Sequence, residues 1–340
     1  MILHDPNRRL SLRDFGITIP IADDRAEKTL ALLRAHPWLG PRAVRWYRTP
    51  AAERITRADL CRAHSPAYVE RLFGDGLEGE IVRTYELMDA RGRRHRYHPE
   101  LARQPLRGIL ERTLGIVSGT WQCCRLALAE GFCFYFGGGM HHAQWDFGNG
   151  FCLLNDIVVA IRKLQAEGLV RTAWVVDVDA HKGDGTAALT SGDPSILTLS
   201  VHMARGWPLD GSPQNPNGTP NPSFIPSDID IPIESGEEDR YVARLAPGLE
   251  EMVARLPAPE IAVVVGGADP YEKDGLPSTA GLNLTLAELG ARDRLVYDFL
   301  KSRRIPQAHL MAGGYGPHAW EVYAQFLPWA LLGHLGAGAP

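Results

Sequence analysis

The chain has 340 residues, of which 45% are hydrophobic and 22% are charged. This composition is typical of a folded globular protein and excludes a disordered chain or a fibre. The 36 Lys and Arg against 40 Asp and Glu give a formal net charge of -4, so we expect no binding to nucleic acid through overall charge.

The first residues contain no apolar segment of signal-peptide length, and no apolar run reaches the roughly 20 residues that a membrane span requires. The 5 cysteines are odd in number, and no two of them have C-x-x-C spacing. We interpret them as reduced, mostly buried thiols, which favours a cytoplasmic location. A membrane is not among the expected partners.

Short apolar runs alternate with helical patterns in the second half of the chain. In chain order, the predicted buried strands are 132–136, 173–179, 196–201, 261–265 and 307–311. One predicted helix begins near Asn155, and another begins at Thr285, where Glu288 completes a capping box, and runs to about Ser302. Such strands between helices indicate a mainly parallel sheet covered on both faces. We therefore predict an α/β fold, a three-layer α/β/α sandwich.

Segment 210–232 is dense in Pro, Asn, Ser and Gly and comes closest to a linker. Because it lies between two well-patterned regions, we interpret it as a long surface loop. No internal repeat or low-complexity tract divides the sequence. Residues 1–340 are therefore predicted to form a single domain.

Carboxylates and an imidazole follow two of the predicted strands. Asp177, Asp179 and His181 stand at alternate positions, and Asp269 follows the sequence Gly-Gly-Ala. Strand periodicity places alternate side chains on one side, and the carboxyl ends of parallel strands meet at one edge of the sheet. Two Asp and one His with room for a water form the open ligand set of a catalytic zinc site. The spacing alone leaves open that the Asp residues cap helices or accept from backbone amides.

Two adjacent histidines, His141 and His142, follow three glycines at the end of another predicted strand. Two imidazoles near carboxylates are suited to acid and base chemistry near neutral pH. Asp177 and Asp184 are the acids available to fix their tautomers and raise their basicity. A structural role for the histidines is the alternative.

Tyr315 lies among glycines after the last predicted strand. In that position a phenol can donate a hydrogen bond to a developing oxyanion. An aromatic side chain packed in a surface turn is the alternative.

Taken together, five motifs resemble those of the histone deacetylase family, in the family's order and over roughly residues 130 to 320. A sixth, weaker resemblance is His64-Ser65-Pro66 with Tyr68. The five motifs are Gly138-Gly139-Met140-His141-His142-Ala143, Gly150-Phe151-Cys152-Leu153-Leu154-Asn155-Asp156, Asp177-Val178-Asp179-Ala180-His181, Gly267-Ala268-Asp269 and Gly313-Gly314-Tyr315.

The resemblance implies the fold of the arginase and deacetylase superfamily and a zinc-dependent hydrolase that removes an acyl group from lysine. Asp179, His181 and Asp269 would hold one zinc ion per subunit. A structural potassium ion is also implied. Its ligands would come from Asp177, Asp179, His181, Ser200 and Val201.

The resemblance also implies a role for each catalytic side chain. His142 would be the general base, with Asp184 behind it, and His141 its electrostatic or acid partner, with Asp177 behind it. Tyr315 would polarise the acyl carbonyl opposite the metal.

The residues implied to contact the substrate are Gly150, Phe151 and Gly313. Phe151 would line a tunnel for the acylated lysine, and Gly150 would accept a hydrogen bond from the substrate amide. Trp207 is either a wall of the same tunnel or a buried structural residue.

Three segments depart from the family pattern. Lys182 stands where many members carry a second His, which resembles the class IV branch. That branch includes enzymes that remove long fatty acyl groups, so the acyl group is left open. Residues 16–26 and 206–210 differ from the segments that surround the mouth of the site in the family. The basic cluster Arg91, Arg93, Arg94, His95 and Arg96 fits a solvated loop better than a docking site for an acidic partner.

Three alternative functions differ in the residues that they require. Acetylpolyamine hydrolysis shares the catalytic residues and would use acids at the mouth, for which Glu78, Glu80 and Glu86 are candidates. A non-catalytic ligand sensor is disfavoured because no ligand, base or Tyr is missing. Arginase-like chemistry requires a second metal, whose acidic ligands are replaced here by Gly183 and Tyr271. The expected partner is an acylated lysine in a protein or peptide, or a small acylated amine. The oligomeric state and the choice between zinc and iron(II) stay open.

Overall fold

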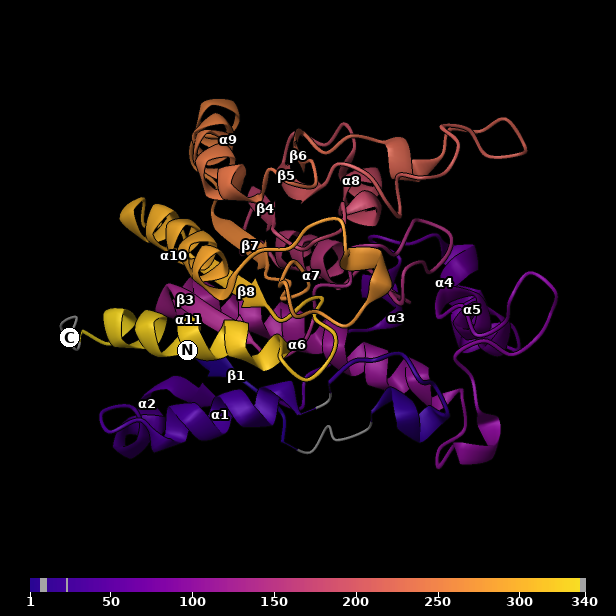
Figure 1. Cartoon of the computed structure of the whole chain (residues 1–340), viewed down its shortest axis with the longest axis horizontal. Helices are drawn as coiled ribbons and strands as arrows, with labels where there is room; N and C mark the ends of the chain where they lie inside the picture. The colour runs from indigo at the N-terminus through magenta and orange to yellow at the C-terminus, as the bar shows by residue number, and fades with distance from the viewer. Residues whose placement is uncertain (7–10, 23, 337–340) are drawn as a thin grey trace.

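The computed structural model describes residues 1–6, 11–22 and 24–336. At its centre lies one sheet of eight strands, all parallel, in the order β2-β1-β3-β8-β7-β4-β5-β6 (Figure 1). The strands are β1 Ile2–Leu3, β2 Tyr47–Arg48, β3 Phe132–Tyr135, β4 Ala173–Asp177, β5 Ile196–Met203, β6 Ile229–Ile233, β7 Ile261–Val265 and β8 Gln307–Leu310.

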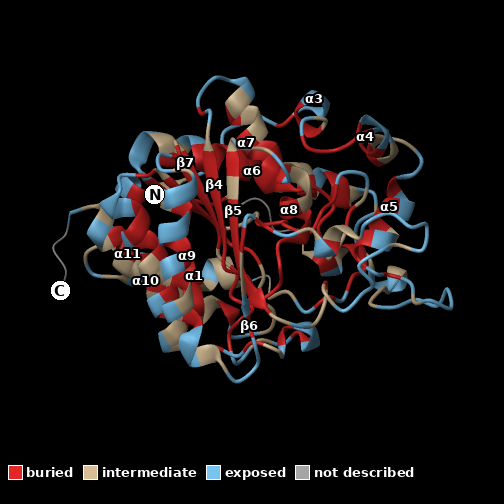
Figure 2. Cartoon of the chain, turned by 90° about the horizontal axis from the view of Figure 1, so that it is seen from above, coloured by how far each residue is buried: buried red, intermediate tan, exposed pale blue. Residues whose placement is uncertain are grey.

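Helices cover both faces of this sheet. The α-helices are α1 Arg25–Ala35, α2 Ala43–Trp46, α3 Arg57–Leu60, α4 Pro66–Phe73, α5 Leu77–Thr84, α6 Gly108–Glu130, α7 Asp156–Ala166, α8 Asp184–Thr190, α9 Tyr241–Arg255, α10 Leu286–Ser302 and α11 Ala319–His334. Helices α6 and α7 pack together in one layer, and α1, α9, α10 and α11 form the other. Figure 2 shows the buried strands between helices whose outer sides are exposed. The predicted three-layer α/β/α fold is confirmed.

Local sequence signals account for the helix starts that were predicted. The side chain of Asn155 accepts a hydrogen bond from the Val158 amide and caps α7. Thr285 and Glu288 form the predicted capping box of α10, which ends at Ser302. Each cap satisfies backbone amides that have no partner within the first helical turn.

The prediction of a loop over 210–232 is wrong at its end, because residues from Ile229 onward form strand β6. This strand pairs only with β5 and therefore lies at an edge of the sheet. Pro232 is tolerated there because an edge strand does not need every amide as a donor. At the opposite edge, β1 and β2 have two residues each, too few to give a periodic signal.

All five cysteines are free, and four of them are buried, as expected from their number and spacing. Among the described residues, no helix is long and apolar enough to cross a membrane.

The order of the strands explains why distant motifs meet. Strands β3, β8, β7 and β4 are consecutive neighbours in the sheet. The loops that follow them carry the histidine pair, Tyr315, Asp269, and Asp179 with His181, respectively. In a parallel sheet these loops share one edge, where α/β proteins bind ligands.

Candidate metal centre and active site

Asp179, His181 and Asp269 form a buried cluster beyond the ends of β4 and β7. Each offers one ligand atom, and these atoms all lie within 4.8 Å of one another. Nδ1 of His181 is 3.3 Å from Oδ1 of Asp179 and 3.2 Å from Oδ2 of Asp269. The loop after β4 is held by hydrogen bonds from the amides of Asp179 and His181 to the carboxylates of Asp177 and Asp179, both 3.1 Å long.

The donor set fits a divalent metal ion. Oδ2 of Asp269 is buried and accepts no hydrogen bond from the described residues. Burial and the neighbouring Asp179 carboxylate raise the pKa of Asp269 to about 7. Two buried carboxylates beside one imidazole nitrogen are unfavourable on their own and are stabilised by a cation. Two oxygens and one nitrogen are ligands that zinc and iron(II) accept.

Gly313 allows the loop after β8 to approach this cluster. Its amide donates to Oδ2 of Asp179 over 3.0 Å. A Cβ atom at this position would clash with the carboxylates of both Asp179 and Asp269. Gly313 therefore lies directly against Asp179 and Asp269.

Three side chains from the α1, α10 and α11 layer donate to carbonyl groups at the strand ends. Nη1 of the buried Arg292 donates to Val178 and Gly267, 2.9 Å in each case. The hydroxyl of Tyr323 donates to Gly266 and Gly313 over 3.3 and 3.2 Å.

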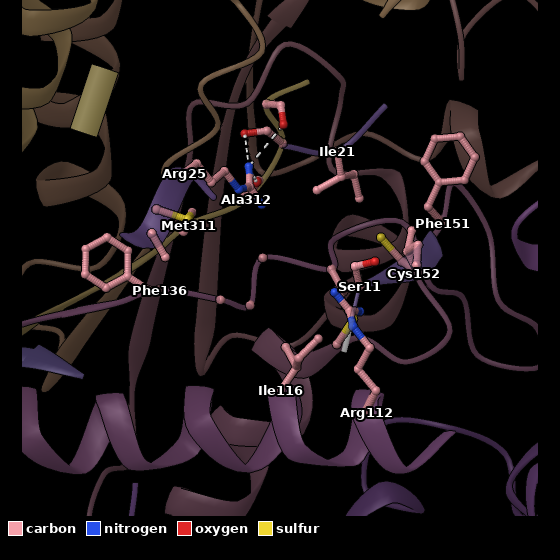
Figure 3. Close-up of a pocket in the computed structure, with 18 of the residues that line it drawn as sticks. Ser11, Ile21, Arg25, Arg112, Ile116, Phe136, Phe151, Cys152, Met311 and Ala312 are labelled. Atoms are coloured by element: carbon pink, nitrogen blue, oxygen red, sulfur yellow. Dashed lines mark hydrogen bonds between the residues drawn. The ribbon is translucent and has the colours of Figure 1, made fainter. Parts of the chain in front are cut away.

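The third donor, Arg25, reaches the carbonyls of Ala312, Gly313 and Gly314 at 3.0, 3.4 and 3.2 Å (Figure 3). None of these three donors was identified from the sequence. A helical Arg or Tyr carries no local signal for a contact with a distant strand end, so only the three-dimensional packing identifies it.

His141 and His142 lie side by side, with ring centroids 3.9 Å apart. Nδ1 of His141 is 2.7 Å from Oδ2 of Asp177, and Nδ1 of His142 is 2.6 Å from Oδ1 of Asp184. These contacts leave the Nε2 atoms for chemistry. Gln144, which was not predicted, donates to the second oxygen of Asp184 over 2.8 Å.

The two imidazoles have opposite electrostatic environments. Burial alone would lower the pKa of His141, but the carboxylates of Asp177 and Asp179 raise it to about 9. Burial and the neighbouring His141 lower the pKa of His142 to about 4. The carboxylates thus favour the charged form of His141, and burial beside this ring favours the neutral form of His142.

Asp156 holds the glycine loop that carries the histidines. Its carboxylate accepts from the amides of Gly139 and Met140 over 3.0 and 2.6 Å, and from the Thr120 hydroxyl over 2.5 Å. Asp156 belongs to a motif quoted above, but its spacing did not reveal this role.

Tyr315 is positioned by the loop that follows Asp269. Its amide donates to Oδ2 of Asp274 over 2.7 Å, and its carbonyl accepts from Gly275 over 3.0 Å. In the same loop, the Ser278 hydroxyl lies 3.3 Å from Nε2 of His181. Burial raises the pKa of Tyr315 well above its usual value, so the phenol remains a hydrogen-bond donor.

One cavity of about 1020 Å³ is bordered by some of these groups. Asp179, His181, both histidines of the pair and Tyr315 line it. Apolar side chains extend it, with Phe136 and Met311 on one side and Ile21, Phe151 and Cys152 on the other (Figure 3).

Gly150 and Trp207 lie close to the histidines. The half-buried Trp207 ring lies 4.5 Å from the His142 ring and 5.6 Å from the His181 ring, measured between centroids. Gly150 has a φ of 52°, and a Cβ there would clash with both Trp207 and His142. Trp207 therefore packs against the histidines of the site, and Gly150 makes room for it.

Near the predicted potassium site, the structure shows strand pairing and a hydrogen bond between residues of the chain. Asp177 and Ser200 are opposite each other in β4 and β5, and the Ser200 hydroxyl accepts from the Gly183 amide over 3.4 Å. Nζ of Lys182 points elsewhere, to Asp230 at 3.1 Å and Ser227 at 3.2 Å. Its charge is thus paired with Asp230, and the potassium ion stays a prediction.

The acids considered for a polyamine site are not among the residues that line the cavity. Glu80 is buried and pairs with Arg71 and Arg83, and Glu86 pairs with Arg96. Glu78 lies in the first turn of α5.

The comparison with known protein families agrees with the fold and the site. The family model of the histone deacetylase domain matches residues 19–328. This range covers most of the chain, and the chain belongs to the histone deacetylase domain family. The resemblance drawn from the motifs is confirmed at this level.

Individual relatives match only part of this chain. An uncharacterized protein of Picosynechococcus sp. is 34% identical over 216 residues, which cover 63% of this chain and 66% of that protein. Histone deacetylase 2 of Arabidopsis thaliana is 27% identical over 61% of this chain and 50% of its own length. The acetoin utilization protein AcuC of Staphylococcus aureus is 30% identical over 55% of this chain and 47% of its own length. The chain thus matches less than two thirds of each of these proteins.

Proposed function

We propose that this chain is a zinc-dependent amidohydrolase that removes an acyl group, acetyl or longer, from the ε-amino group of lysine. One observation carries the proposal. Asp179 and His181 of a buried Asp-His-Asp cluster line a single cavity together with two carboxylate-backed imidazoles and a tyrosine, and Asp269 completes the cluster behind them. Family membership supports the broader class of deacetylases and deacylases. A cytoplasmic location stays a prediction.

Asp179, His181 and Asp269 would hold one zinc ion per subunit. When bound, such an ion would supply Lewis acidity, which polarises the amide carbonyl and lowers the pKa of water so that it becomes a better nucleophile on losing a proton. The further roles belong to the chain's own side chains. A structural potassium ion near Asp177 and Ser200 belongs to the proposal as well.

In this mechanism His142 is the general base. Its Nδ1–H donates to Asp184, which fixes the tautomer and leaves Nε2 to take a proton from the attacking water. His141, backed by Asp177, stabilises the charge that develops and delivers a proton to the leaving amine. The opposite directions of the two pKa shifts support this division of labour.

Tyr315 donates its phenol hydrogen to the acyl oxygen as negative charge develops there. Phe151 flanks the lysine side chain, Gly150 accepts from the substrate amide, and Gly313 leaves space beside the ligands. Trp207 is not among the residues that line the cavity and supports the histidine rings instead. The apolar part of the cavity, with Phe136 and Met311, has room for acyl groups longer than acetyl.

The test compares wild type with Tyr315→Phe on lysine peptides acylated from acetyl to myristoyl, with acetylated polyamines alongside. We expect turnover of an acyl-lysine and a fall in kcat of about 100-fold or more in the variant, at unchanged metal content. Turnover confined to polyamines, or a variant as fast as wild type, would contradict the proposal.

A further inference from the structure

Residues 83–112, which we call the rim segment, carry a charge opposite to that of the whole chain. The segment contains eight arginines and four acidic residues, a formal excess of four positive charges in a chain of net charge -4. The arginines are Arg83, Arg91, Arg93, Arg94, Arg96, Arg103, Arg107 and Arg112. Such a local excess creates a positive field at the surface even when the whole molecule is acidic.

The rim segment borders the catalytic cavity. The guanidinium carbon of Arg96 lies 5.4 Å from the ring centroid of Phe151, a cavity residue. The Phe151 amide donates to the carbonyl of Thr84 over 3.0 Å. Further along the segment, Gln104 and Arg112 line the same cavity. Figure 3 shows Phe151 and Arg112 on the same side of the cavity, opposite Phe136.

The junction of the rim segment and the cavity has an unusual backbone. Among the described residues, only four other than glycine have a positive φ, and three of them are Glu86, Arg96 and Phe151, at 52°, 54° and 65°. Glu86 and Arg96 form an ion pair of 2.9 Å, and Arg96 covers Phe151. Backbone conformations of this kind concentrate at ligand-contacting sites, where the surroundings hold them.

The arginines divide into structural and available ones. Arg93 pairs with Asp89 at 2.8 Å, and Arg96 with Glu86, so these two fix the loop. Arg94 is exposed and only 3.4 Å from the equally exposed Glu100. Arg91 is exposed and has no ion pair with the residues that the structure describes. Both guanidinium groups are exposed, and such groups can bind carboxylates in bidentate fashion.

The sequence alone favours a solvated loop here, but the contacts of the segment with the cavity point to more. We propose that the rim segment binds acidic residues flanking the acylated lysine, so that the substrate is an acyl-lysine within an acidic stretch of peptide. This inference rests on the proposed function and narrows its substrate class. Complementary charge speeds encounter, and a lysine-rich flank or a polyamine would be repelled. Arg91 and Arg94 provide the contacts, while Arg93 and Arg96 hold the loop against Phe151.

The experiment measures kcat/KM on three acyl-lysine peptides with acidic, neutral or basic flanks, each normalised to an acyl-lysine amide without flanks. For wild type at low salt, we expect the acidic peptide to exceed the basic one by about tenfold, and the preference to shrink at about 0.5 M salt. In Arg91→Glu/Arg94→Glu the preference should reverse.

Arg45→Glu/Arg294→Glu is the matched control, because it makes the same charge change at two exposed arginines outside the rim segment. It should keep the acidic preference. Equal normalised kcat/KM values for all three peptides, or the same loss in the control, would overturn the inference. A rim segment that binds a short single-stranded oligonucleotide through Arg91 and Arg94, without preferring acidic peptides, would overturn it as well. No turnover of the flank-free amide would instead mean that the proposed function has failed.

Discussion

The carboxyl edge of the sheet and the rim segment 83–112 border the same cavity but carry their charges in different ways. At the sheet edge Asp177 and Asp184 are buried, and each contacts a histidine at 2.6 to 2.7 Å. In the rim segment Arg91 and Arg94 are exposed. Buried contacts fix geometry strictly because each lost partner leaves an unsatisfied group, whereas exposed charges are worth little individually. In the proposed mechanism the reaction therefore depends on the sheet edge, and in the inference drawn above the choice of substrate depends on the rim segment.

The largest expected effect follows from removing a metal ligand. His181→Ala or Asp269→Ala should lose the ion and reduce kcat/KM by about 1,000-fold or more, because no other group can replace the missing ligand. Metal analysis of the dialysed proteins, together with turnover, checks this. A variant that retains both the ion and its activity would refute the assignment of the ligands.

A smaller effect is expected at Arg292, whose side chain donates hydrogen bonds to carbonyl groups at the sheet edge. Arg292→Met leaves the carbonyls of Val178 and Gly267 without this donor, and it should weaken metal affinity by about 10- to 100-fold. Competition with a chelator measures the affinity, and Arg292→Lys is the matched variant that keeps the charge. Lower stability with unchanged metal affinity would limit Arg292 to a structural role.

The buried His64 tests whether a buried polar contact makes the stability of the fold depend on pH. It is buried, with Nδ1 2.8 Å from the Gln144 carbonyl, and its Nε2 accepts from the Asn155 amide over 3.0 Å. Burial lowers its pKa from 6.5 to about 4. The unfolded chain therefore binds a proton first as pH falls, and stability is lost between pH 6.5 and 4.

At pH 4.5 this loss should be about 2 kcal/mol relative to pH 7. Urea unfolding of wild type and His64→Gln in the same chelating buffer measures it. The stability difference between the two proteins should narrow by that amount as the pH falls. A difference that stays constant would show that His64 does not titrate as described.

The smallest expected effect lies in the rim segment. Arg91→Glu alone should lower kcat/KM for an acidic peptide by only about two- to fivefold at low salt, and less at high salt, because an exposed charge is screened. A salt series with the Arg45→Glu variant as control separates this local effect from a change in net charge. The same decline in both variants would remove the functional difference between the two regions.

The sequence predicts the strands and the candidate site residues better than it predicts the contacts that hold them in place. The apolar runs of β4, β5 and β7 and the capping residues Asn155 and Thr285 act locally, so their patterns predict the elements correctly. The sequence pattern did not predict strand β6. Its Pro232 is tolerated only at the edge of a sheet, and the position of a strand in a sheet is not a local property. The contacts of Arg25 and Arg292 with strand-end carbonyls depend on how the helices pack over the sheet, which no spacing encodes.

The measurement that bears most directly on the proposed mechanism is single-turnover cleavage of an acyl-lysine peptide by wild type and Tyr315→Phe, both with verified metal content. Tyr315 touches the reacting carbonyl in this mechanism, and its backbone contacts with Asp274 and Gly275 do not depend on the phenol oxygen. We predict that the variant binds the peptide about as well as wild type and cleaves it at least about 100-fold more slowly. Equal cleavage rates would show that the tyrosine does not stabilise the transition state and would contradict the proposed mechanism.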